Sequence, residues 1–319
     1  MRSTRAGGSL SRGRGSGHSA AGAAAELKAT ASSYPSLKQI LAWVDGSDRD
    51  RAVLDQALQV ALRYASHIDV LHVRLDARGA AAGNDAVLQL DSLLGIPVER
   101  AAAEAATRAR MHFEEWHGQN GLPLRDIAAA SHEPSTRWRE IVGFENEVVA
   151  RLGRLSDLIV MPRPRERSSS SSLIALESAL FDTCRPVLMV PQGAPRSLLH
   201  HPLIAWNGSL EAARAVGFAL PFLSESRSVV GVFIAPEAKH RTDPDELLYY
   251  LGWHGIVAER FSLDDQRPAG ARLLAQAEAN GSGLIVMGAY THGHYRQFLF
   301  GGVTRHVMDH AAVPILLAH

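Results

Sequence analysis

Cysteine is almost absent from this 319-residue chain, in which Cys184 stands alone. A single cysteine excludes an internal disulfide framework and any zinc site built from several thiolates. The chain also lacks a run of 18 apolar residues and the short apolar core of a secretory signal. We therefore expect a cytoplasmic protein that neither spans nor contacts a membrane.

Net charge is absent too, because 33 Lys and Arg residues balance 33 Asp and Glu residues. A nucleic-acid-binding protein normally carries a basic surplus, so no nucleic-acid partner is expected. The balance hides a basic segment, residues 1–35, which is rich in Ser, Gly, Ala and Arg. Such a composition cannot bury enough apolar surface to fold, and it predicts a disordered tail. The hydrophobic fraction of 46% indicates that the remainder is globular.

One sequence pattern occurs twice after this tail. An apolar run is followed by an acid or an amide, then by Gly-Ser and a helix-forming stretch, with Asp45 and Asn207 at matching places. Trp43 and Trp206 are interpreted as equivalent core residues of the repeat. The repeat predicts a domain over residues 36–192, a linker over 193–200 and a second domain over 201–319.

Each copy alternates apolar strands with amphipathic helices, which predicts an α/β fold with a doubly wound, five-stranded parallel sheet. Strands are expected near residues 38–44, 68–73, 124–130, 157–161 and 186–190, and again near 202–206, 228–234, 256–261, 283–287 and 314–318. Helices are expected near residues 48–65, 98–119, 138–154 and 172–183, and again near 209–223, 243–254, 268–280 and 301–311. Ser47 and Ser209 are the expected N-caps of the first helix in each copy.

Glycine-bearing turns in the second copy are candidates for phosphate binding. Ligands of open α/β sheets bind beyond the carboxyl ends of the strands, where the strand order reverses. In the second copy, the first strand ends at Trp206 and the fourth runs into Gly288, while Gly301 and Gly302 open the next helix. Glycines at a helix N-terminus let backbone N–H groups approach a phosphate.

Residues 283–318 resemble the C-terminal block of the universal stress protein family, which has a Met-Gly turn, a Gly-(Ser/Thr)-Val helix start and a final Pro-Val-Leu strand. The opening of each copy also resembles the first strand of that family. The resemblance covers residues 38–319 and implies two tandem domains with adenine-nucleotide alpha-hydrolase-like, flavodoxin-like layering. It further implies that the last strands, 186–190 and 314–318, pair to form an intrachain pseudo-dimer. Members of this family commonly form dimers through that edge, so a homodimer of two chains is a further expectation.

The resemblance implies a nucleotide site in the second copy only. The motif Gly-x2-Gly-x9-Gly-(Ser/Thr) is half kept, because Gly288 and Gly301 match it whereas Thr291 and Gly302 replace its second glycine and its hydroxyl residue. In the first copy, Pro162 stands at the first glycine position and cannot donate an N–H, so this copy is expected to bind no nucleotide. The residues expected to contact ATP, with Mg²⁺, are Trp206, Asn207, Ile234, Met287, Gly288, Tyr290, Thr291, Gly301, Gly302, Val303 and Thr304.

Two functions remain open at this point. The first is a stress-response protein whose second domain binds ATP or another adenine nucleotide as a sensory or regulatory ligand. The second is a nucleotide-free interaction protein that acts through its dimer surfaces, with glycines that only shape a tight turn and close packing. The chain has no Walker lysine, no acidic pair for Mg²⁺ and no poised base, so no catalytic residue is assigned and at most weak ATPase activity is expected.

Two sets of charged or titratable residues are not assigned a ligand. His306 and His310 share a helix face but lack a third ligand, so no metal site is predicted. Arg163, Arg165 and Arg167 are interpreted as a solvated loop and not as a phosphate clamp.

Overall fold

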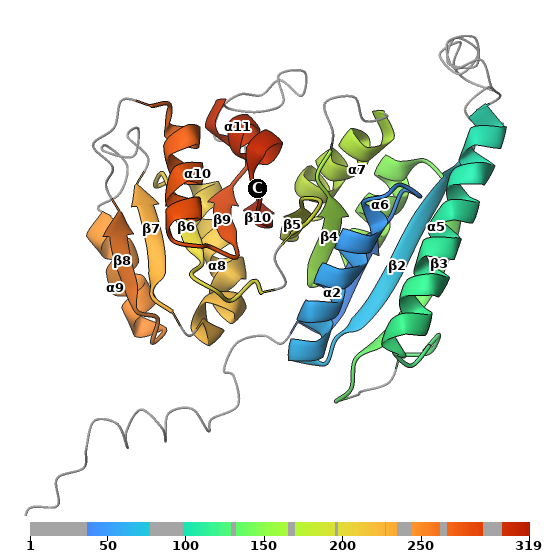
Figure 1. The fold of residues 1–319 in the computed structure, drawn as a ribbon, viewed down its shortest axis with the longest axis horizontal. Coiled ribbons are helices and arrows are strands. Elements are labelled where there is room, and N and C mark those ends of the chain that lie inside the picture. The colour runs from blue at the N-terminus through green and yellow to red at the C-terminus, as the bar shows by residue number, and fades with distance from the viewer. Residues whose placement is uncertain are drawn as a thin grey trace, which may run out of the picture. The chain divides into compact units, whose positions relative to one another are not determined.

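The structure is a computed structural model, and it describes residues 37–76, 98–128, 132–164, 170–194, 197–226, 228–234, 244–261, 267–289 and 302–319. The predicted tail, 1–35, lies outside these residues. The described residues form a ten-stranded sheet in two halves of five strands, with helices packed against it (Figure 1). Within them, no helix combines the length and the apolar character needed to cross a bilayer.

The elements follow the alternation that the sequence predicts. The first half contains β1 (Gln39–Trp43), α2 (Asp50–Tyr64), β2 (His67–Leu75), α5 (Val98–Asn120), β3 (Ser135–Gly143), α6 (Glu145–Gly153), β4 (Leu158–Pro162), α7 (Ser170–Phe181) and β5 (Val187–Val190). The second half contains β6 (Leu203–Trp206), α8 (Leu210–Glu225), β7 (Val230–Ile234), α9 (Pro244–Trp253), β8 (Ala258–Phe261), α10 (Ala269–Ala279), β9 (Ile285–Gly288), α11 (Gly302–His310) and β10 (Ile315–Ala318).

The strand order is β3-β2-β1-β4-β5-β10-β9-β6-β7-β8. Neighbouring strands within each half run parallel, whereas β5 and β10 pair antiparallel, with Leu188 opposite Leu316. The predicted fold class and the predicted intrachain pseudo-dimer are therefore confirmed. Joining the two strands covers an apolar edge on each half that would otherwise be open to pairing.

The core extends without a break across this junction. Central strands are apolar along their whole length, as expected for a parallel sheet that is buried on both faces. Ile159 and Met189 of the first half belong to the same buried cluster as Ile285 and Leu317 of the second. The two halves are thus stabilised by shared apolar burial as well as by strand pairing.

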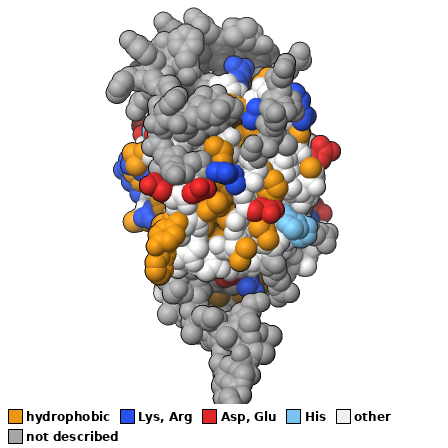
Figure 2. All heavy atoms as spheres, turned by 90° about the vertical axis from the view of Figure 1, so that its left-hand side faces the viewer, with side chains coloured by type: hydrophobic (Ala, Val, Ile, Leu, Met, Phe, Trp, Pro, Cys, Tyr) orange, Lys and Arg blue, Asp and Glu red, His pale blue; other side chains and the backbone are white. Residues whose placement is uncertain are grey.

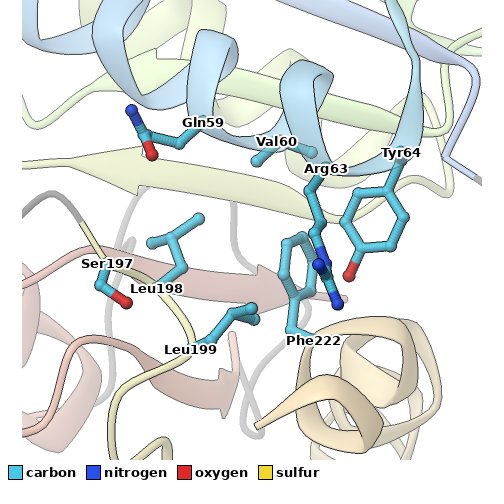
Figure 3. A pocket seen from close by; sticks show the side chains of 8 residues that line it. All are labelled: Gln59, Val60, Arg63, Tyr64, Ser197, Leu198, Leu199 and Phe222. Atoms are coloured by element: carbon cyan, nitrogen blue, oxygen red, sulfur yellow. The ribbon is translucent and has the colours of Figure 1, made fainter. Parts of the chain in front are cut away.

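Helices α2 and α8 make a second contact between the halves (Figure 3). The hydroxyl of Tyr64 donates to the carbonyl oxygen of Pro221 over 3.0 Å, and its ring meets Phe222 edge-on at 5.9 Å between centroids. Arg63 forms an ion pair with Glu225 beside them. These groups surround a cavity of about 170 Å³, so the helices touch around its rim and do not pack completely.

The third strand of the first half does not lie at residues 124–130, where it was predicted. It spans Ser135–Gly143, and the earlier segment contributes one isolated bridge, from Leu124 to Thr136. The helix predicted from residue 138 accordingly begins at Glu145. The prediction favoured an apolar run, whereas β3 is an edge strand with Arg137 on a face that meets buried Asp69 of β2. A cross-strand ion pair of this kind leaves no apolar pattern in the sequence.

The two tryptophans are buried, as predicted, but they are not equivalent. Strand register aligns Leu41 of β1 with Leu203 of β6, because each pairs with the isoleucine of the repeated Leu-Ile-Val-Met run. Trp43 therefore corresponds to Ala205, one residue before Trp206. A shift of one residue places side chains on opposite faces of a sheet. Trp43 and Ala205 accordingly contribute to one apolar cluster that does not include Trp206.

Candidate functional site

The strand order of the second half reverses at β6. This strand pairs with β7 on one side and with β9 on the other, and all three run parallel (Figure 1). Trp206 and Gly288 therefore end neighbouring strands at the same edge of the sheet. This is the position at which α/β sheets bind ligands, as the sequence predicted.

A tight turn follows β6. Gly208 has a φ of 71°, a conformation that favours glycine. The amide oxygen of Asn207 accepts from the backbone N–H of Ser209 over 3.1 Å. Ser209 in turn accepts from the N–H of Ala212 over 3.2 Å, so it is the predicted N-cap of α8. The Asn207 side chain also carries an amide nitrogen, which is a hydrogen-bond donor.

Gly288 is explained by packing alone. A Cβ added to this residue would lie 2.5 Å from the backbone nitrogen of Ala212, in the first turn of α8. A glycine is required there for α8 to approach β9, whether or not a ligand binds. Packing alone therefore explains why the first glycine of the motif is present.

Gly302 is different, because packing does not require it. It is the first residue of α11, it is exposed, and a Cβ added to it would meet nothing within 4 Å. The N–H groups of the first turn of a helix have no intrahelical acceptor, and the helix dipole makes this end positive. Val303 is partly buried against the core and Thr304 is 8% exposed, so the start of α11 is firmly packed.

The remaining predicted site residues are distributed unevenly. Ile234 ends β7 beside Trp206, to which it is paired, and it is half-buried. Met287 is buried in the apolar core cluster, so its side chain serves packing. Tyr290, Thr291 and Gly301 lie outside the described residues.

Arg49 lies where the strand order of the first half reverses, which is the position that corresponds to the candidate site of the second half. Its guanidinium forms an ion pair with Asp45 after β1 and donates to the carbonyl oxygen of Arg163 after β4 over 2.9 Å. Its Nε also donates to the hydroxyl of Ser47 over 3.0 Å. Arg49 is only 7% exposed. The reversal point of the first half is thus bridged by one of its own side chains, which the sequence analysis did not identify.

The buried carboxylate of Asp50 holds the same turn through hydrogen bonds. It accepts from the N–H groups of Asp45 and Gly46, each over 3.0 Å, and from Nδ1 of His112 on α5 over 2.9 Å. Burial raises the pKa of Asp50 to about 6, although the hydrogen bond from His112 opposes the shift. Helix α2 begins at Asp50 itself, with Arg49 at its N-cap position, so the prediction that Ser47 is the N-cap is wrong. The carboxylate of Asp50 already holds the turn.

Arg163 connects this closed site to the second half. Its guanidinium donates to the carbonyl oxygen of Ala311 over 2.6 Å, directly after α11 ends. A cation at a helix C-terminus is stabilised by the helix dipole. Burial lowers the pKa of Arg163, so the interpretation of this residue as part of a solvated loop is wrong. Arg165 and Arg167 lie outside the described residues.

The histidine pair on α11 has a local role. The rings of His306 and His310 stack at 4.5 Å between centroids, and Nδ1 of His310 is 2.9 Å from the carbonyl oxygen of His306. Across the described ranges, no three His, Cys, Asp or Glu side chains come together in a way that could hold a metal ion.

Comparison with known proteins identifies the family of this fold. Residues 253–319 match the model of the Universal stress protein family. The fold is similar to that of a universal stress protein from Archaeoglobus fulgidus DSM 4304, with a TM-score of 0.60 and 17% identity over 89% of this chain and 99% of that one. It is also similar to a functionally unknown protein from Pseudomonas aeruginosa PAO1, with a TM-score of 0.50 and 13% identity over 88% and 92% of the two chains.

None of the curated proteins matches the chain. At identities this low, the solved structures establish the fold and not the ligand. The family match covers α11 and β10, which contain the candidate phosphate-binding turn and the strand that joins the halves. Residues 253–319 therefore match the universal stress protein family, and the tandem fold of a universal stress protein covers both halves of the chain.

Proposed function

We propose that the second half binds an adenine nucleotide, ATP with Mg²⁺ in the first instance, as a sensory ligand in a stress response. The observation that supports this most is the start of α11. Gly302, the first residue of this helix, is exposed, and a Cβ added to it would meet nothing within 4 Å. The first turn of α11 contains no acidic residue.

Each group has a defined part in this proposal. The N–H groups of Gly302 and Val303 bind phosphate oxygens, and the helix dipole favours the negative charge. The amide nitrogen of Asn207 donates to the base. No group in the described residues is placed to activate a water for attack on phosphorus, so the ligand is sensed and not rapidly hydrolysed.

In this proposal, the first half binds no nucleotide. Arg49 stands between the ends of β1 and β4, and it would have to leave both Asp45 and the Arg163 carbonyl to admit a ligand. We retain the boundaries 36–192 and 201–319, with a linker at 193–200, together with a cytoplasmic location, as parts of the same proposal.

Substitution of Gly302 tests the nucleotide site directly. In Gly302→Glu, a carboxylate at the helix N-terminus stabilises α11 yet repels phosphate. Gly302→Gln has the same size without the charge. Isothermal titration of ATP into the full chain should show affinity at least tenfold weaker for the Glu variant than for the Gln variant. Equal affinities would place the phosphates elsewhere, and no heat from the unaltered chain at high micromolar ATP would refute nucleotide binding.

A second candidate function, a protein-interaction module, is favoured by the surface of α9. Tyr249 and Trp253 are 68% and 76% exposed, and Val257 beside them is 71% exposed. Hydrophobic side chains gather on this side of the molecule (Figure 2). Large exposed aromatic residues are typical of binding surfaces. If Trp253→Ala changes the sedimentation of the chain while ATP binding stays constant, α9 is an association surface, and the two functions are then separable.

A further inference from the structure

The amino ends of β1, β2 and β3 surround a cavity of about 510 Å³, here named the amino-end cavity. Lys38 directly precedes β1, His67 opens β2 and Ser135 opens β3. Arg125 and His132, from the segment that leads to β3, complete the lining. The cavity lies in the first half, whereas the strand ends that form the candidate nucleotide site belong to β6 and β9 of the second half. Its volume is within the range of small-molecule sites.

The lining carries an excess of positive charge. Lys38, Arg125 and Arg137 are cationic, and Asp126 is the one carboxylate among the residues that line the cavity. A concave surface with this charge concentrates anions near it.

Arg137 is held in place from beneath the cavity. Its Nε and a terminal nitrogen donate to the two oxygens of Asp69 over 2.7 and 2.9 Å, and the Asp69 side chain is only 5% exposed. Burial opposes ionisation of Asp69, but hydrogen bonds from His67 and Arg137 hold its pKa well below its usual range. Asp69 therefore stays charged, and the bidentate pair fixes the guanidinium. Arg139 lies 3.3 Å from the same carboxylate. The single negative charge of Asp69 is therefore shared by two arginines and does not neutralise both of them.

Two cationic side chains still have bonding capacity. Arg125 is half-buried, and its guanidinium makes no hydrogen bond or ion pair in the described part of the chain. Nζ of Lys38 donates to the carbonyl oxygens of Tyr64 over 2.9 Å and Ala65 over 3.5 Å, which leaves its third N–H available. A guanidinium that has lost part of its hydration gains most from a charged acceptor.

We propose that the amino-end cavity binds a small organic anion through a carboxylate or phosphate group, with Arg125 and Lys38 as its direct ligands. Arg137, fixed by Asp69, supplies the adjoining positive wall. His67 is positioned on the floor by Ser135, whose hydroxyl lies 2.8 Å from its Nδ1. The site is independent of the proposed nucleotide site, because no residue is shared between them.

The test uses the full chain and two probes, inorganic phosphate and citrate, each titrated in low salt and followed by isothermal titration and by thermal unfolding. Arg125→Gln removes the proposed ligand, and Arg100→Gln is the matched control, since Arg100 is an exposed arginine paired with Glu104 on α5. Circular dichroism verifies that each variant is folded. We expect Arg125→Gln to weaken binding of the better probe at least tenfold and to abolish its thermal stabilisation. The Arg100→Gln chain should bind like the unaltered chain.

The nucleotide-site variant completes the design. Gly302→Glu should leave citrate binding unchanged, because Gly302 opens α11 in the second half and does not line the cavity. Preference for phosphate or for citrate then identifies the anionic group of the ligand. Unchanged affinity in Arg125→Gln, loss of citrate binding in Gly302→Glu, or no binding of either probe at millimolar concentration would each overturn the proposal.

Discussion

The two halves differ most at the turn that follows their first strand. In the first half this turn contains Asp45, Arg49 and Asp50, all involved in ion pairs or buried hydrogen bonds. In the second half the corresponding turn carries Asn207, and its helix is capped by Ser209 in the ordinary way. The same backbone turn is therefore held by an arginine ion pair and a buried carboxylate in the first half, and by the side chains of Asn207 and Ser209 in the second.

Under the proposed function, this difference explains why the first half would bind no nucleotide although it keeps the same fold. A cation supplied by Arg49 lies between the ends of β1 and β4, where the phosphates of a nucleotide would bring negative charge in the other half. The arginine is satisfied by Asp45 and by a backbone carbonyl, so no ligand is needed to stabilise it. Through Arg163 and Ala311, the closed half also caps the helix that carries Gly302.

The largest expected effect comes from Gly46, which a helix of the first half covers. Gly46 has a φ of 78°, and a Cβ there would overlap the carbonyl oxygen of Ala105 on α5. Gly46→Val should lower the free energy of unfolding by about 4 kcal/mol, through backbone strain and overpacking together. Gly121→Val is the control, since its φ is 64° but a Cβ there meets nothing within 4 Å. Equal losses in urea denaturation would show that α5 does not pack on this turn as described.

Asp50 gives the next largest effect, and the effect depends on pH. The pKa of this carboxyl is raised to about 6 in the folded chain from an ordinary value of 3.8, so the folded state binds more protons than the unfolded state between these values. Stability should therefore fall as the pH rises from about 4 to 6, by at most about 3 kcal/mol. Asp50→Asn removes the titrating group, and the difference between the two denaturation series isolates its contribution. A difference that stays constant across this pH range would contradict the raised pKa.

The smallest effect compares the two serines. Ser209→Ala removes an N-cap hydrogen bond and should cost about 1 kcal/mol. Ser47→Ala removes only contacts to Arg49, whose guanidinium keeps Asp45 and the Arg163 carbonyl, and should cost less. Thermal unfolding of both variants measures the difference. A larger loss from Ser47→Ala would mean that Ser47 does cap α2.

Much of the fold was predictable from the sequence because its signals are local or repeated. Apolar runs such as the one at Leu158 mark buried parallel strands wherever they occur, and their recurrence identifies the second domain. The third strand was missed because β3 is stabilised by an ion pair with Asp69, a residue 66 positions before its first member. The equivalence of Trp43 and Trp206 was wrong because strand register, set by pairing with β4 and β9, follows the match of Asp45 with Asn207, which places Trp43 at the position of Ala205.

In the candidate site too, some features were predictable from the sequence and others were not. Gly288 matches the motif, whereas Gly302 replaces its hydroxyl residue. The distance to Ala212 shows that packing requires Gly288, and a Cβ on Gly302 would meet nothing within 4 Å. Arg49 follows Asp45 by four residues, a spacing that also occurs in many exposed helical pairs. Only the approach of β4 to β1 converts that pair into a closed site, because it brings the carbonyl of Arg163 to the same guanidinium.

The sequence by itself determined the tandem α/β repeat, the order of its elements and the half that carries the glycines of the candidate phosphate-binding turn. These properties follow from periodicity and composition, which are encoded along the chain. Tertiary structure alone decided that β5 joins β10, that Arg49 closes the first half and that cationic side chains surround the amino-end cavity. Each of these depends on contacts between distant residues, whose free energy is set by geometry and burial and leaves no periodic pattern in the sequence.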